Sequence, residues 1–170
     1  YAQGGIATVM SSPDNFDKHI EETLITGDSH SDLAAVEKVI REAPAQIEEL
    51  LSWGVDFDKN PDGHFDLHRE GGHTENRILH HKDNTGYEIQ QSLIRQVRNN
   101  KNILVFENHF AIEILTQHHL GEVVTQSTPN IECYGAYVLN NQSNHIHPFL
   151  SKVPSLATGG LGTAYVNTTN

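Results

Sequence analysis

The sequence predicts an α/β fold with α+β character, and two kinds of apolar pattern indicate it. Apolar residues recur at helical spacing through the first hundred residues, and short β-like runs follow. A continuous apolar run at residues 102–107 separates the two parts and is typical of a strand buried on both faces. A helix followed by such a strand favours α/β layering.

Two helices are predicted before residue 54. The first begins near residues 11–14 and carries Phe16, Ile20 and Leu24 at helical spacing. The second covers residues 36–51, where apolar residues follow the i, i+3, i+4, i+7 pattern. Pro44 lies inside it and lacks an amide hydrogen, so we expect a kink or break there. Gly54 stands where a C-terminal cap belongs.

A short hairpin and a third helix follow. Apolar residues alternate on both sides of the turn sequence at 60–63, which predicts a hairpin (Val55, Phe57, Phe65 and Leu67). Thr85 and Glu88 form a capping-box sequence, which predicts a helix beginning there. The apolar face of that helix would be Ile89, Leu93, Ile94 and Val97.

The remainder predicts an antiparallel β-meander. Short β-like runs at 111–115, 122–125 and 134–139 are separated by polar turns. A further strand is expected from residue 153 into the glycine turn at Gly159 and Gly160. We find no internal repeat.

Composition restricts the function classes. Twenty-two acidic residues against eleven basic ones give a net charge of −11, which would repel a phosphate backbone and argues against nucleic-acid binding. No apolar run reaches the roughly eighteen residues that a membrane span requires. The single cysteine, Cys133, suits a reducing compartment. We therefore expect a cytoplasmic protein without membrane partners.

Residues 67–80 form the most unusual stretch. They combine histidines and charged residues with the adjacent glycines Gly71 and Gly72, which allow a bend or a close approach to a ligand. A solvated turn is one interpretation of this stretch, and a recognition loop is the other.

Twelve histidines raise the possibility of a metal site. Only His64 and His68 have the i, i+4 spacing of a helical ligand pair, and they fall in the predicted hairpin. Scattered surface histidines are therefore favoured and no metal is expected, although a histidine-rich metal-binding protein stays an alternative. No local signature of a nucleophilic triad or of a nucleotide-binding glycine loop is present.

Several longer motifs identify a resemblance that covers the whole chain. They are Tyr1-Ala2-Gln3-Gly4-Gly5-Ile6-Ala7, Leu67-His68-Arg69-Glu70-Gly71-Gly72-His73-Thr74, Arg77-Ile78-Leu79-His80, Asp83-Asn84-Thr85-Gly86 and Leu156-Ala157-Thr158-Gly159-Gly160. In this order they resemble the flavoproteins of the succinate dehydrogenase and fumarate reductase superfamily, and within it the L-aspartate oxidases. Tyr165 and residues 168–170 continue the match.

The resemblance implies an FAD enzyme that oxidises L-aspartate to iminoaspartate in NAD biosynthesis, with oxygen or fumarate reoxidising the flavin. Quinolinate synthase would then use the iminoaspartate. Glu70 stands where succinate dehydrogenases have an apolar residue, and a carboxylate there could bind the substrate ammonium by a charge-assisted hydrogen bond. A fumarate reductase or succinate dehydrogenase fragment, or a truncated domain without catalysis, are the alternatives.

The same resemblance implies which residues contact FAD. The flavin side would be lined by Tyr1, Ala2, Gln3, Gly4 and Gly5. Phe110 and Ala111 would contact the adenine side through backbone atoms, and Ala157, Thr158 and Gly159 would pass the cofactor. Catalytic arginine and histidines are not matched, and neither Arg69 nor Arg77 corresponds to them.

The resemblance also implies that residues 1–170 are part of one FAD-binding domain. In the superfamily the diphosphate-binding βαβ unit precedes this segment, and the capping domain and the C-terminal helical domain follow it. We therefore expect the isolated chain to be inactive and to bind FAD weakly or not at all.

Overall fold

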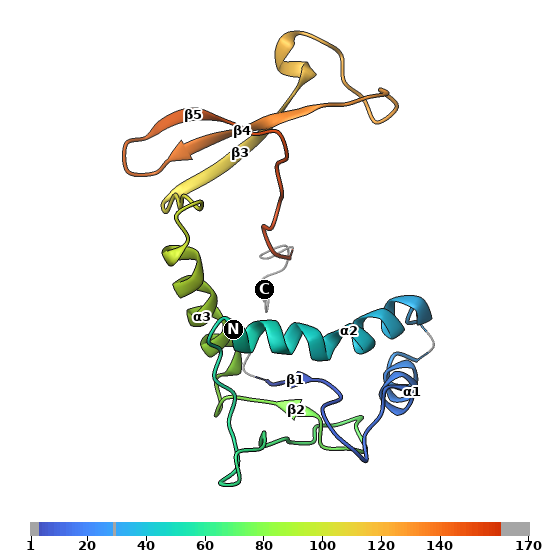
Figure 1. The fold of residues 1–170 in the computed structure, drawn as a ribbon. Helices are drawn as coiled ribbons and strands as arrows, with labels where there is room; N and C mark the ends of the chain where they lie inside the picture. Colours follow the sequence, from blue (N-terminus) through green and yellow to red (C-terminus); the bar gives the residue numbers. More distant parts are fainter. Residues whose placement is uncertain (1–3, 29, 161–170) are drawn as a thin grey trace, which may run out of the picture. The chain divides into compact units, whose positions relative to one another are not determined.

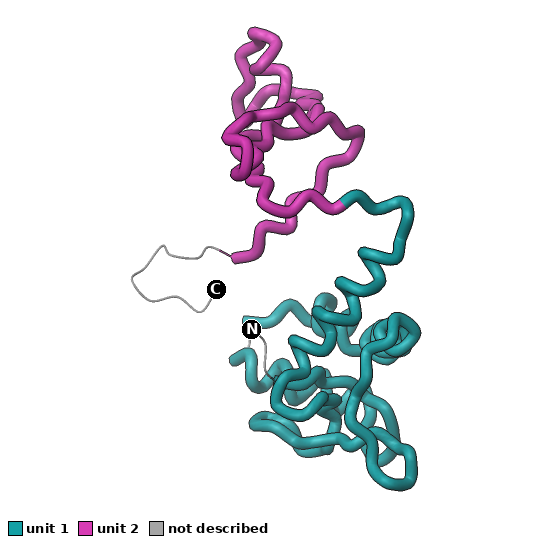
Figure 2. The backbone as a smooth tube through the Cα atoms, turned by 90° about the vertical axis from the view of Figure 1, so that its left-hand side faces the viewer, with its two compact units in different colours: residues 1–104 teal, residues 105–170 magenta. Residues whose placement is uncertain are grey.

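The computed structural model describes residues 4–28 and 30–160. The chain divides into two compact units, Tyr1–Leu104 and Val105–Asn170 (Figure 2). The first unit contains β1 (Ile6–Ala7), α1 (Phe16–Thr26), α2 (Leu33–Ser52), β2 (Ile78–Leu79) and α3 (Thr85–Asn99) (Figure 1). The second contains β3 (His109–Thr116), the 3₁₀ helix η1 (Gln117–Leu120), β4 (Cys133–Asn140) and β5 (His145–Leu150). The described α-helices therefore belong to one unit and the longer strands to the other.

The first unit is built around a small apolar cluster. Ile47 of α2 packs with Val55, Phe57 and Leu79, all of which are buried. β1 pairs antiparallel with β2, with Ile6 opposite Leu79. The cluster thus joins the helix predicted from periodicity to the hairpin residues and to β2, which lies near the end of the 67–80 stretch.

The two helices before residue 54 are confirmed, with caps of the expected chemistry. Asn15 caps α1 by accepting a hydrogen bond from the amide of Lys18 at 2.9 Å, and Asp32 caps α2 through the amide of Ala35. Gly54 has φ +87°, the left-handed conformation that a helix C-terminus favours.

The predicted break at Pro44 is wrong. α2 runs without interruption from Leu33 to Ser52 with Pro44 inside it. Eleven helical residues precede the proline and eight follow it, and Ile40 and Ile47 on either side are both buried. Packing of this face outweighs the one backbone hydrogen bond that the proline removes.

α3 is confirmed, but the capping box at its start is wrong. Asn84 is the N-cap residue and makes no side-chain capping bond. The Thr85 hydroxyl instead accepts from the amide of His81 at 3.0 Å, and Glu88 accepts from the amide of Asp56. Both side chains serve contacts with neighbouring segments, which sequence spacing alone does not reveal.

The buried strand predicted at residues 102–107 is also wrong. No strand is assigned there, and the apolar side chains are exposed, with Leu104 79% and Val105 56% accessible. The segment lies at the boundary of the two units. An apolar run indicates burial only where a partner surface covers it, and the described residues of this chain leave about half or more of each of these side chains uncovered.

The predicted hairpin at residues 55–67 is present in reduced form. Its pairing is a single antiparallel bridge between Lys59 and Phe65, closed by the Asn60 amide donating to the His64 carbonyl at 2.8 Å. Gly63 in the turn has φ +89°. The segment delivers the chain directly to residues 67–80, as expected.

The second unit confirms the predicted antiparallel meander, but its third strand is not one of the segments that the sequence predicted. Its order is β3-β4-β5, both pairs antiparallel. Residues 122–125 and 153–160 are not strands, and residues 153–160 are exposed. β5 is the third strand of this sheet instead. The predicted α/β fold with α+β character, a mixture of helices and antiparallel strands, is therefore confirmed.

None of the helices in the described part of the chain combines the length and the hydropathy needed to cross a membrane.

Candidate functional site

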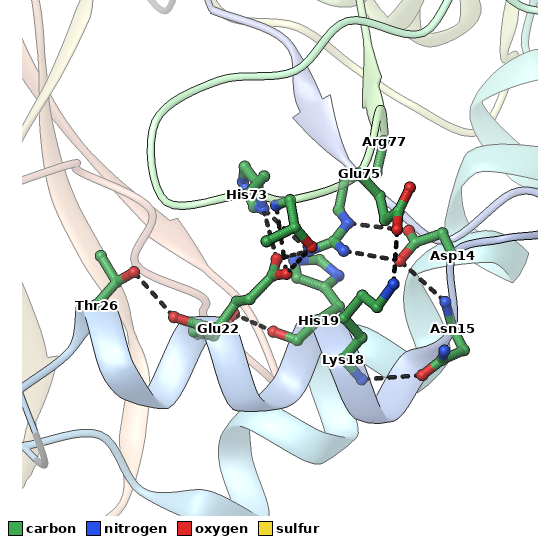
Figure 3. A network of polar contacts seen from close by, with 11 residues as sticks. Asp14, Asn15, Lys18, His19, Glu22, Thr26, His73, Glu75 and Arg77 are labelled. Carbon is green, nitrogen blue, oxygen red and sulfur yellow. Dashed lines mark hydrogen bonds and ion pairs between the residues drawn. The ribbon is translucent and has the colours of Figure 1, made fainter.

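Arg77 organises the polar side of the first unit. Its side chain is completely buried, and its guanidinium makes a two-pronged contact with Asp14 through Nε at 2.9 Å and Nη2 at 2.7 Å (Figure 3). The Nη1 atom donates to Glu22 at 2.5 Å. A planar guanidinium fits this arrangement because its donors form a rigid fork that matches two carboxylates.

The network fixes residues 73–77 against α1. Glu22 also accepts from the Thr74 hydroxyl and from the Thr74 amide. Lys18, one turn earlier on α1, donates to Glu75 at 2.6 Å. The C-terminal part of the 67–80 stretch is therefore anchored to one helix by several charge-assisted contacts, as a preorganised recognition loop requires.

Two histidines close the network. Arg77 Nη1 lies 3.0 Å from Nδ1 of His73, and a guanidinium can only donate, so this nitrogen accepts. The His19 ring meets the His73 ring edge-on, with centroids 5.4 Å apart. Burial lowers the pKa of His19 below 6.5, and the positive charge of Arg77 lowers it further. His19 is therefore held neutral at pH 7.

The contacts of the network shift the pKa values of Glu22 and Arg77 toward their charged forms. Burial acts to raise the pKa of Glu22, but hydrogen bonds from Thr74 and Arg77 outweigh it and leave the pKa lowered. Burial likewise opposes the charge of Arg77, while its bonds to Asp14 and Glu22 raise its pKa. One buried cation and two carboxylates therefore form the anchor.

Glu70 precedes this anchor and is exposed. Among the described side chains, only its Oε1 atom would come within 4 Å of a Cβ placed on Gly4, at 4.0 Å. Gly4 is itself exposed. The structure therefore brings together the predicted substrate contact and one of the predicted flavin contacts, although they are 66 positions apart in the sequence.

The surroundings of Gly4 and Gly5 differ. A Cβ on Gly5 would lie 2.3 Å from the Leu79 carbonyl oxygen, so the close approach of β1 to β2 requires glycine there. Among the described residues only Glu70 comes near a Cβ placed on Gly4, so these residues leave its backbone accessible to a flat ring. Tyr1, Ala2 and Gln3 lie outside the described residues.

In the second unit, Phe110 and Ala111 lie on β3. Phe110 is 62% exposed, and Ala111 pairs with Val138 of β4. In the described part of the chain β3 pairs only with β4, so its other edge offers unpaired backbone donors and acceptors. Those groups fit the backbone contact to an adenine that the resemblance implies.

Ala157, Thr158 and Gly159 are exposed and belong to no strand. Gly159 has φ +78°, and no atom of the described residues lies within 4 Å of a Cβ placed on it, which fits a turn that a cofactor could approach. An open Gly4 and an open β3 edge thus fit part of an FAD site within each unit.

The sequence did not single out Arg77, Asp14 and Glu22 as a unit. Asp14 and Glu22 are more than fifty residues from Arg77, and no local spacing connects them. The one sequence signal given above is that Arg77 lies in a motif of the resemblance. Chemically, the anchor can position Glu70 and its loop, and the exposed carboxylate can bind a cation or an ammonium group.

Comparison with protein families gives a match over the full chain. Residues 1–170 match the family described as FAD binding domain. L-aspartate oxidase 2-b from Nicotiana tabacum is 41% identical over 170 residues, covering 100% of this chain and 25% of that protein. The L-aspartate oxidase of Acinetobacter baylyi is 37% identical and is covered to 30%. The chain spans about a quarter to a third of the length of such relatives.

Solved structures of the same superfamily are similar in fold. An Escherichia coli quinol fumarate reductase subunit superposes with a TM-score of 0.69 at 26% identity, covering 82% of this chain and 22% of that one. Mycobacterium smegmatis Sdh1 gives a TM-score of 0.64 at 27% identity, covering 81% and 24%. The plant relatives are named as chloroplastic.

Proposed function

Because the chain belongs to the FAD binding domain family, we propose that it is part of an FAD-dependent L-aspartate oxidase. The proposed reaction is oxidation of L-aspartate to iminoaspartate. The curated relatives at 37–41% identity carry that activity in their names. Identity to the fumarate reductase subunit is lower, at 26%.

The observation that supports this proposal most directly is the position of Glu70. Its carboxylate lies beside the exposed backbone of Gly4, and its loop is anchored by the buried Arg77. Aspartate differs from succinate by one ammonium group, which a carboxylate at this position would bind by a charge-assisted hydrogen bond. Succinate would leave Glu70 without that partner, which disfavours its binding.

FAD would supply the redox chemistry by accepting the hydride that leaves the substrate carbon. The protein residues that we assign to its binding are Gly4, Gly5, Phe110, Ala111, Ala157, Thr158 and Gly159, with Tyr1, Ala2 and Gln3 beside them in the sequence. In this proposal Gly4 presents an open backbone, β3 presents an unpaired edge, and Glu70 orients the substrate amine.

The wider context is part of the same proposal. The segment would act together with a diphosphate-binding βαβ unit, a capping domain and a helical domain, with oxygen or fumarate as acceptor. Iminoaspartate is unstable in water, so a quinolinate synthase would be its consumer. The one cysteine, which is free, supports a cytoplasmic location for this protein.

Two other functions remain to be tested against this one. A fumarate reductase or succinate dehydrogenase segment is favoured by the solved structures, which carry those names. A non-catalytic domain is favoured by the exposed apolar residues at 103–106, which could serve a partner surface. Glu70 argues against the first, and retention of FAD would argue against the second.

The test is Glu70→Gln in an L-aspartate oxidase whose matching segment is replaced by this chain; the Acinetobacter baylyi relative aligns over the whole of it. Loss of a hydrogen bond to a charged group costs about 1.5–3 kcal/mol. We therefore expect kcat/KM for aspartate to fall about 10- to 150-fold, while weak turnover of succinate stays unchanged or rises.

Glu48→Gln is the matched control, because Glu48 is an exposed carboxylate on α2. It should leave both substrates unaffected. Equal losses for aspartate and succinate in Glu70→Gln would contradict the amine-contact role.

A further inference from the structure

We propose a divalent-metal site, suited to Zn²⁺, formed by Asp66, His68 and His80. One ligand atom from each of these residues lies within 4.8 Å of the other two. Two of its ligands, His68 and His80, lie within the 67–80 stretch, but the site uses none of the residues assigned to FAD or substrate. It stands independently of the proposed function.

The spacing of the three atoms suits a tetrahedral ion. Nε2 of His68 lies 3.5 Å from Oδ2 of Asp66, and Nε2 of His80 lies 3.7 Å from the same oxygen. Zinc bonds of about 2.0–2.1 Å at tetrahedral angles place neighbouring ligand atoms about 3.3–3.4 Å apart. These two separations therefore need only a few tenths of an ångström of closure, and the ligand nitrogens of His68 and His80 lie within 4.8 Å of each other.

His80 supplies the second, independent observation. Its side chain is nine-tenths buried, and its Nε2 atom has no hydrogen-bond partner among the described residues. Such a buried acceptor or donor costs free energy unless something satisfies it. Nε2 is the same atom that faces Asp66, so a metal ion there would supply the missing partner.

The other nitrogen of His80 faces a carboxylate. Nδ1 lies 3.3 Å from Oδ2 of Asp58. A proton on Nδ1 directed at Asp58 leaves the Nε2 lone pair free for a metal, and carboxylate–histidine–metal arrangements of this kind are usual at zinc sites. Asp58 itself is held by the Lys82 amide at 2.7 Å.

Backbone hydrogen bonds hold the three ligand-bearing segments together. The Asp66 amide donates to the Asp58 carbonyl at 3.0 Å, and the Asp58 amide donates to the His80 carbonyl at 2.9 Å. His68 and Ile78 form an antiparallel bridge. The ligands therefore project from a small paired framework, which limits the entropy lost on binding an ion.

One adjustment is required. The rings of His68 and His80 stack with centroids 3.8 Å apart and 25° between their planes, so an ion cannot lie in both ring planes at once. The His68 side chain is 59% exposed and can turn about its side-chain bonds, whereas His80 is fixed. Binding should therefore rotate His68 out of the stack while Asp66 and His80 stay in place.

The donor set favours zinc. Two imidazole nitrogens and one carboxylate oxygen match the His₂-carboxylate sets that bind Zn²⁺ with a fourth position open to water. The net charge of −11 also favours a cation. A hard cation such as Mg²⁺ prefers oxygen ligands and should bind far more weakly.

A second histidine cluster, Glu113 with His118 and His119, is a weaker candidate and provides an internal comparison. Both histidines already contact the Glu113 oxygens through Nε2, at 3.2 and 3.4 Å. The buried atom without a partner there is Nδ1 of His119, which is not the atom that faces the carboxylate.

An ion at the proposed site would join the two ends of the loop that carries Glu70. Asp66 and His68 precede that loop and His80 follows it. Zinc would therefore stabilise the loop base and raise the melting temperature in proportion to the logarithm of its concentration.

The experiment is calorimetric titration of Zn²⁺ into the metal-free full chain, alongside His68→Gln. His68 is exposed, so the variant should fold. We expect one Zn²⁺ to bind the original chain, and His68→Gln to weaken that binding at least a hundred-fold. Asp58→Asn should weaken it about 10- to 100-fold, as second-layer carboxylates do.

His64→Gln is the matched control, an exposed histidine four positions before His68, and should bind as the original chain does. A Glu113→Gln variant reports on the second cluster and should also retain the binding. Absence of Zn²⁺ binding by the original chain, or equal binding by His68→Gln, would overturn the proposal. Loss of binding in Glu113→Gln alone would assign the ion to the second cluster and overturn it as well.

Discussion

Replacing Arg77 by Met tests the anchor beneath the 67–80 stretch. The substitution keeps an unbranched side chain of similar length but removes the donors that Asp14 and Glu22 share. The side chain of Asp14 is 3% exposed and that of Glu22 is 12% exposed, so both carboxylates would be left largely desolvated and unpaired.

The magnitude follows from that burial. Removing one partner of a buried ion pair costs about 3–5 kcal/mol, because the other charge stays uncompensated. For a unit of this size each kcal/mol lowers the melting temperature by about 4–8 °C. The expected shift is therefore roughly 12–40 °C, which would leave the first unit largely unfolded at ambient temperature if its stability is ordinary.

Far-UV circular dichroism measures this shift, since all three α-helices belong to the first unit. Arg41→Met is the matched control. Arg41 pairs with Asp17 on the surface, with side chains 49% and 87% exposed, so its loss should cost about 1 kcal/mol or less. Adding Asp14→Asn and Glu22→Gln to Arg77→Met should recover part of the stability. A loss in Arg77→Met no larger than that in Arg41→Met would refute the reasoning.

Three further predictions concern the first unit. The pKa of His19 is lowered in the folded chain, so the unfolded chain takes up a proton first as the pH falls below about 6.5, and the free energy of unfolding decreases there. The melting temperature should therefore drop between pH 7.5 and 5.5, and should drop less in His19→Gln. Pro44→Ala should restore a helix hydrogen bond and raise stability by about 1–3 kcal/mol in urea denaturation. Gly5→Ala should disrupt β1–β2 pairing, because its Cβ would meet the Leu79 carbonyl at 2.3 Å; an unchanged melting temperature would count against that contact.

Local patterns predicted the helices well. Apolar spacing located α1, α2 and α3, and Gly54 marked the end of α2 because a left-handed residue is needed there. The break predicted at Pro44 was wrong, because the missing hydrogen bond is a local loss of free energy while the packing that outweighs it involves residues distant in the sequence. The apolar run at 102–107 misled for the same reason, because burial depends on a covering surface.

β5 was missed because its sequence looks unlike a strand. His145, His147 and Pro148 dilute its apolar residues, and proline normally argues against a strand. β5 pairs only with β4 in the described part of the chain, so Pro148 lies on an edge strand, where a missing amide hydrogen is tolerated.

For the candidate sites too, the sequence predicted individual residues but not which of them lie together in space. Glu70 and Gly4 could be proposed from motifs, but their proximity depends on the pairing of β1 with β2. His68 and His80 were judged scattered because they are twelve positions apart and share no helix. The bridge between His68 and Ile78 brings them together, and no spacing rule predicts that bridge.

The most direct measurement is anaerobic reduction of the flavin in the oxidase that carries this chain as its matching segment. We predict a yellow protein whose visible flavin band bleaches on addition of L-aspartate, and bleaches far more slowly with succinate. A colourless protein, or a flavin that succinate reduces as fast as aspartate does, would contradict it.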